Sequence, residues 1–77
     1  MEIDIICFGK IAEMIKSQRM DIADIGTTDE LKARLEEQFP ALSAIKYKLA
    51  LNKQIVQQNV NLQPNDTVAI MPPFSGG

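Results

Sequence analysis

The chain has 77 residues, of which 45% are hydrophobic and 23% charged, and its formal net charge is −2 at pH 7. This length predicts one domain, the slight acidity gives no electrostatic reason to bind nucleic acid, and apolar runs far below the ~20 residues of a membrane span predict a cytoplasmic protein. With one cysteine and no histidine, the composition excludes an internal disulfide, a cysteine-rich metal site and a Ser–His or Cys–His catalytic pair.

An apolar strand is predicted near the start of the chain, over residues 3–8. Its alternation places Ile5 and Cys7 on one face and Ile6 and Phe8 on the other. Because both faces carry apolar groups, we expect the strand to be central in its sheet or to meet a partner. Cys7 is expected to be a buried structural thiol, since a reactive thiol needs accessible, electropositive surroundings.

A short amphipathic helix is predicted next, over residues 10–17, because three apolar side chains recur there at helical spacing. These side chains, which we expect to face the core, are Ile11, Met14 and Ile15. Residues 18–25 follow as a second strand, in which Met20 alternates with acidic neighbours.

The main helix is predicted to begin at a capping box. The Thr27 hydroxyl can accept from the Glu30 amide, while the Glu30 side chain reaches back to the Thr27 N–H. Pro40 sets the end of this helix, which is about eleven residues long. One face carries an apolar stripe that recurs every fourth residue: Leu31, Leu35 and Phe39.

Three short strands are predicted in the second half of the chain, over residues 47–52, 54–57 and 67–71. The connector before them is expected to tuck in Leu42 and Ile45. Asn52-Lys53 and Pro64-Asn65 are predicted turns, since asparagine tolerates positive φ. The result is an α+β fold in two layers, with one main helix across a mixed sheet of about five strands and a short additional helix. Its first and last strands, the most apolar ones, are candidates for the centre.

The remaining place for chemistry is the end of the chain, Pro72-Pro73-Phe74-Ser75-Gly76-Gly77. Acidic side chains are scattered and Gly9 has no phosphate-binding pattern, so we expect the chain not to be an enzyme on its own. The two prolines end the last strand because neither donates a backbone hydrogen bond. Glycine lets a backbone pass a narrow channel, and a partner can activate a terminal carboxylate as an acyl-adenylate. We therefore divide the chain into a domain over residues 1–71 and an extended tail over residues 72–77.

Two stretches carry a family resemblance: Leu51-Asn52-Lys53-Gln54-Ile55-Val56, and residues 62–77 with their Pro-Pro-Phe-Ser-Gly-Gly end. They resemble the small subunit of molybdopterin synthase, a MoaD/ThiS-type sulfur carrier. The opening strand with Phe8, the short helix and the capped helix match that family's layout, so the likeness covers the whole chain. Asn65 departs from the family's usual turn glycine, and Ala12 stands where many relatives carry an arginine.

The resemblance implies a ubiquitin-like β-grasp fold and a sulfur-carrier function in molybdenum cofactor biosynthesis. An ATP-dependent activating enzyme would adenylate Gly77, and a sulfur donor would convert it to a thiocarboxylate. In a heterotetramer, the large catalytic subunit of molybdopterin synthase would take up the tail and pass the sulfur to cyclic pyranopterin monophosphate. The chain itself would bind no cofactor or metal, and ATP would be used by the activating partner. The tail residues that give clearance and set the exit would be Gly76, Ser75, Phe74, Pro73 and Pro72.

Three apolar side chains, Phe8, Ile55 and Met71, are not accounted for under the main helix. We predict that they form one exposed patch beside the tail that both partners use; the alternative is that loops bury them. Three other functions stay open: a ubiquitin-like modifier joined to lysines through Gly77, the sulfur carrier of thiamine synthesis, and an interaction module with an inert tail.

Overall fold

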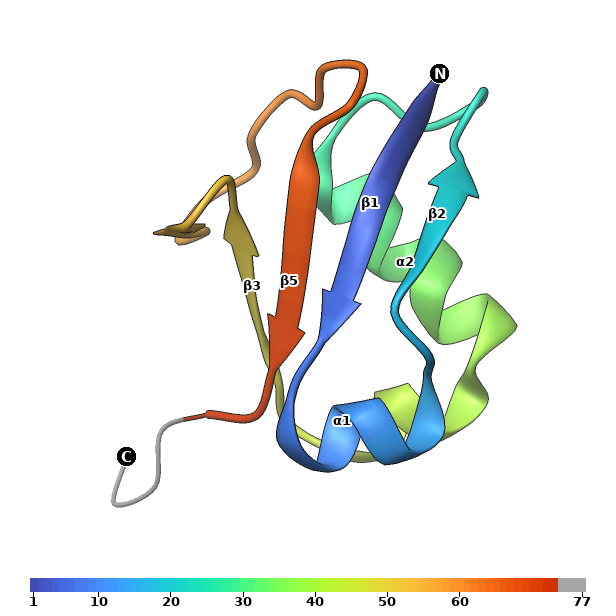
Figure 1. Cartoon of the computed structure of the whole chain (residues 1–77), viewed down its shortest axis with the longest axis vertical. Coiled ribbons are helices and arrows are strands. Elements are labelled where there is room, and N and C mark those ends of the chain that lie inside the picture. Colours follow the sequence, from blue (N-terminus) through green and yellow to red (C-terminus); the bar gives the residue numbers. More distant parts are fainter. Residues whose placement is uncertain (74–77) are drawn as a thin grey trace.

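The computed structural model describes residues 1–73, in which a five-stranded sheet is backed by a helix on one face (Figure 1). The tail residues Phe74, Ser75, Gly76 and Gly77, on which several predictions fall, lie outside the described residues. The elements in chain order are β1 (Glu2–Cys7), α1 (Gly9–Met14), β2 (Gln18–Asp21), α2 (Thr28–Gln38), the 3-10 helix η1 (Pro40–Ala44), β3 (Lys48–Leu51), β4 (Gln54–Ile55) and β5 (Thr67–Met71). This order confirms the predicted α+β fold of the β-grasp type, with one main helix and a short additional one.

The two most apolar strands, which were candidates for the centre, lie side by side in the interior of the sheet; the strand order itself was not predicted. The strand order is β2-β1-β5-β3-β4. β1 and β5 run parallel, with Ile5 opposite Val68 and Cys7 opposite Ile70, whereas the other neighbouring pairs are antiparallel. Because parallel strands point the same way, β1 and β5 end at the same edge of the sheet (Figure 1).

The core lies between this sheet and α2. Alternation along β1 buries Ile3 and Ile5 and leaves Ile6, on the other face, 36% exposed. Burying one such aliphatic side chain stabilises the fold by about 1.5–3 kcal/mol. Six of the side chains that meet in the core are at most 2% exposed: Ile3 and Ile5 of β1, Leu31 and Leu35 of α2, and Val68 and Ile70 of β5.

The N-terminus of α2 carries the predicted cap, with one difference. The Glu30 N–H donates to Thr27 Oγ1 at 3.3 Å, as predicted. The Glu30 carboxylate, however, accepts from the Gly26 N–H at 2.8 Å instead of from the Thr27 N–H. Its Oε1 thereby also accepts from the Thr27 hydroxyl at 3.4 Å, so one carboxylate serves two donors at the helix entry.

The short helix and the connector differ from their predictions. α1 ends at Met14, because Ile15 already has extended backbone. In so short a helix only Ile11 is buried, while Ile15 enters the core from the extended segment. Met14 and Ile45, both predicted to face the core, are instead 39% and 38% exposed.

Two turns with left-handed residues hold the start of β5. Asn52, Lys53 and Asn65 have φ of 49°, 76° and 67°, which confirms both predicted turns. The half-exposed Asn52 amide donates to Asp66 Oδ1 at 2.9 Å, and Asp66 Oδ2 accepts from the Gln63 N–H at 2.7 Å. One buried carboxylate therefore joins the two turns, which fixes where the last strand begins.

Thr27→Ala is expected to lower the free energy of unfolding by about 1 kcal/mol, because the Glu30 N–H loses its side-chain acceptor. Urea unfolding followed by circular dichroism measures the change. Thr27→Ser, which keeps the hydroxyl, should stay within a few tenths of a kcal/mol of the parent. Equal stability of the Thr27→Ala variant and the parent would contradict the role of this cap.

Candidate functional site

The described residues hold no ready-made catalytic or metal centre. Within residues 1–73 no group of three or more His, Cys, Asp or Glu side chains is placed to hold a metal ion. Across the same residues, none of the helices is both long and apolar enough to span a bilayer.

The single cysteine is buried, as predicted. Cys7 is free and 7% exposed, within the core on the predicted face of β1. Burial raises the pKa of its thiol, so less of the reactive thiolate is present at neutral pH. The Cys7 N–H donates to Ser17 Oγ at 2.9 Å, which ties this strand to the segment after α1.

A groove lies where the two central strands end. The Phe8 N–H donates to the Ile70 carbonyl at 3.0 Å and prolongs the pairing beyond β1. After Phe8 the chain turns into α1, and after Met71 at the end of β5 it continues into Pro72-Pro73. The groove between them has a volume of about 1210 Å³. Its apolar lining comes mainly from Phe8, Met14, Ile45, Met71, Pro72 and Pro73.

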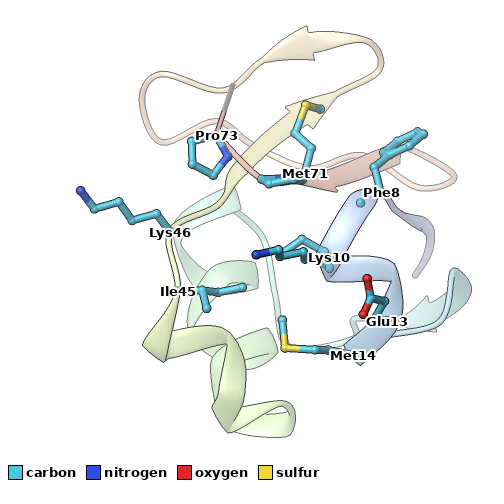
Figure 2. Close-up of a pocket in the computed structure, with 11 residues that line it drawn as sticks. Phe8, Lys10, Glu13, Met14, Ile45, Lys46, Met71 and Pro73 are labelled. Carbon is cyan, nitrogen blue, oxygen red and sulfur yellow. The ribbon is translucent and has the colours of Figure 1, made fainter. Parts of the chain in front are cut away.

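The apolar floor of this groove is open to solvent and flanked by charge. Phe8 is 50% exposed, the largest exposed fraction among the large hydrophobic side chains of the described residues. Figure 2 shows Phe8 and Met71 on one side and Met14 and Ile45 on the other, with Lys10 between them. Lys46 and Glu13 also line the groove. Exposed apolar surface rimmed by polar groups is typical of a protein–protein contact site.

The root of the tail is packed against a glycine. Gly9 has φ of 57°, a left-handed conformation that L side chains rarely adopt. A Cβ at this position would lie 2.9 Å from Pro72 Cγ and 3.3 Å from Pro72 Cδ. From the sequence alone, Gly9 was predicted only to break the run between a strand and a helix. Its contact with Pro72, at the far end of the chain, was not predicted.

The structure brings together two of the three predicted patch residues. Phe8 and half-buried Met71 share the groove beside the prolines. Ile55 is 40% exposed but lies on β4, paired with Ala50, and borders separate hollows near Val56. The register places all three on the sheet face opposite α2, because alternate residues of paired strands share a face. Their use by a partner stays a prediction.

Comparisons with known proteins agree over nearly the whole chain. The model of the ThiS family matches residues 5–77. The molybdopterin synthase sulfur carrier subunit of Chlamydomonas reinhardtii is 34% identical, with 100% of this chain and 100% of that protein covered.

Two solved structures share the fold. Small archaeal modifier protein 1 from Methanosarcina acetivorans superposes with a TM-score of 0.79 at 17% identity, covering 99% of this chain and 96% of that one. A chain from the complex of subunits 1 and 2 of molybdopterin-converting factor from Helicobacter pylori gives 0.74 at 24% identity, with 100% of both chains covered. At these identities the structures show the fold alone.

Alkylation of Cys7 by iodoacetamide is expected to be at least about tenfold slower in the folded chain than in urea, because the thiol is buried and its pKa is raised. The rate in the folded state should keep climbing with pH past the ordinary thiol pKa of about 8.5, where the rate of an unperturbed thiol levels off. Intact-mass analysis of timed samples measures both rates. Equal rates in the two states would show an accessible thiol.

Proposed function

The chain belongs to the ThiS family, and we propose that it is the sulfur-carrier subunit of molybdopterin synthase. The observation that carries the proposal is the 34% identity to a molybdopterin synthase sulfur carrier subunit, which extends over the whole of both chains. The family match runs to Gly77, the residue to which we assign the reacting carboxylate.

Activation needs a leaving group, because a carboxylate is a poor electrophile. On an ATP-dependent activating enzyme, a Gly77 carboxylate oxygen forms a bond to the α-phosphorus of ATP, and pyrophosphate leaves. A hydrosulfide ion supplied by the donor then forms a C–S bond to the acyl carbon, and AMP leaves with the oxygen. The product is a Gly77 thiocarboxylate, and every catalytic group in these steps belongs to the partners.

Sulfur donation follows in the large catalytic subunit. The thiocarboxylate sulfur forms a bond to a carbon of cyclic pyranopterin monophosphate as a carbon–oxygen bond at that carbon breaks. Hydrolysis of the acyl–sulfur bond then leaves the sulfur on the substrate and returns Gly77 to its carboxylate. The carrier can then be activated again. Two donations supply the sulfur atoms of the molybdopterin dithiolene.

The described residues support this role by presenting the tail. β5 lies in the centre of the sheet and leads directly into Pro72-Pro73, so the tail leaves from the most firmly held strand. Two prolines restrict the backbone before binding, which lowers the entropy lost when the tail enters a partner. Phe8 and Met71 beside this root offer apolar surface for the body of the same partner to cover.

The remaining alternatives share parts of this chemistry. A protein modifier would also be adenylated at Gly77 but would end joined to lysines. The likeness to small archaeal modifier protein 1, at 17% identity, shows the fold alone and does not favour that outcome. The sulfur carrier of thiamine synthesis would serve another acceptor, and an inert tail would not be adenylated.

Deletion of Gly77 is expected to lower ATP–pyrophosphate exchange by the cognate activating enzyme at least about 100-fold, because the terminal carboxylate would fall about 3.5 Å short of the reacting position. Ser75→Ala is the matched control: it removes a tail hydroxyl but keeps the chain length, and it should retain exchange within about twofold. Unchanged exchange after the deletion would favour the inert-tail alternative.

Met71→Asp is expected to weaken binding to the large subunit at least about tenfold, a loss of about 1.4 kcal/mol, because a carboxylate would be buried against apolar surface. Isothermal titration calorimetry measures the affinity. Met14→Asp changes an exposed methionine on the opposite side of the groove and serves as the control. A larger loss for Met14→Asp than for Met71→Asp would move the contact away from the predicted patch.

A further inference from the structure

The contact between Gly9 and the Pro72 ring fixes the direction in which the tail leaves the domain. We infer that Gly9 is a positioning residue for the carrier reaction: its missing side chain allows Pro72 to lie where it does, and Pro72 aims Gly77. The inference rests on the proposed function, because it concerns delivery of the Gly77 carboxylate. Gly9 itself touches no reacting atom.

The space at Gly9 is too small for a methyl group. A Cβ would lie 2.9 Å from Pro72 Cγ, whereas non-bonded carbon atoms prefer about 3.5–4.0 Å. The ring would have to retreat by about half an ångström or more. It cannot swing away as a flexible side chain would, because its atoms include the backbone nitrogen and Cα of Pro72. A change of ring pucker can move Cγ, but Cδ is bonded to the backbone nitrogen, so relief of the 3.3 Å approach to Cδ moves the backbone.

The residues on either side of Pro72 direct such a movement toward the end of the chain. Met71 is held in β5 opposite Lys48 of β3, so adjustment on the domain side is restricted. On the tail side Pro73 has a fixed φ and narrows the conformations open to Pro72. On the activating enzyme, a tail bound in extended form would then end with its carboxylate displaced, because each later residue adds at most about 3.5 Å of reach. Displacing a reacting group by about 1 Å can cost about 100-fold in rate.

Gly9→Ala would have a second effect that must be separated from the first. At φ of 57° an alanine is strained whatever surrounds it, which destabilises the fold. This strain is the same whether or not a ring occupies position 72. Collision with the ring, by contrast, disappears in the Pro72→Ala background, so a double-mutant cycle isolates it.

The test is ATP–pyrophosphate exchange by the cognate activating enzyme, with kcat and KM measured for the parent, Gly9→Ala, Pro72→Ala and the double variant. Gly9→Ala is expected to lower kcat about tenfold and to change KM by less than about threefold, because the docking surface stays intact while the carboxylate is misplaced. In the Pro72→Ala background the same substitution should cost at most about twofold. Gly26→Ala is the matched control, since its Cβ would meet only Glu30 Oε1 at 3.6 Å.

Urea unfolding of all variants shows whether each is folded in the assay. If Gly9→Ala alone does not fold but the double variant folds and matches Pro72→Ala in kcat, the inference is supported, because removing the ring relieves the clash. Equal losses of kcat in both backgrounds, no loss in either, or failure of both Gly9 variants to fold would overturn it. Absence of exchange with the parent chain would instead overturn the proposed function and the inference with it.

Discussion

Parallel pairing of β1 with β5 is the interaction on which the rest of the structure depends. It sets Cys7 opposite Ile70, so the first strand and the last strand end together although they come from opposite ends of the chain. The residues that follow them, Phe8-Gly9 and Met71-Pro72, therefore become neighbours and line one groove. Without this pairing the tail would have no fixed root and no apolar surface beside it.

The described residues form a scaffold, whereas the proposed reaction takes place at the end of the chain. Its cysteine is buried with a raised pKa, and the described part of the chain contains no cluster able to hold a metal ion. The proposed function places the reaction at a backbone carboxylate instead, which needs activation by a partner. Polar links such as Asp66 between two turns and Arg19 on Glu2 and Asp4 hold the sheet around β5. A domain this small has a limited core, so such links help to keep the central strand in register.

Local sequence signals were sufficient for most of the fold. Alternation predicted the buried face of β1, the Thr27–Glu30 spacing predicted the start of α2, and Asn52 and Asn65 predicted left-handed turns. One local signal was wrong. Met14 has helical spacing to Ile11, but α1 is too short to turn both toward the core. The helical spacing therefore predicted more buried residues in α1 than the structure has.

The site was predictable in its composition and only partly in its geometry. The resemblance pointed to the tail, and strand alternation pointed to a patch of Phe8, Ile55 and Met71. Phe8 and Met71 lie together, whereas Ile55 lies farther along the sheet face near other hollows. The role of Gly9 could not be predicted, because a glycine's neighbours in space are invisible until the sheet order is known. The reacting group was thus easier to propose from this sequence than the contacts that position it.

Fragmentation mass spectrometry of the intact chain, purified from cells that contain the activating enzyme and the sulfur donor, tests the central claim most directly. The account predicts a mass gain equal to the exchange of one oxygen for sulfur, located by the fragments at Gly77 and lost on hydrolysis. A chain with an unmodified Gly77, or with added sulfur located only at Cys7, would contradict it.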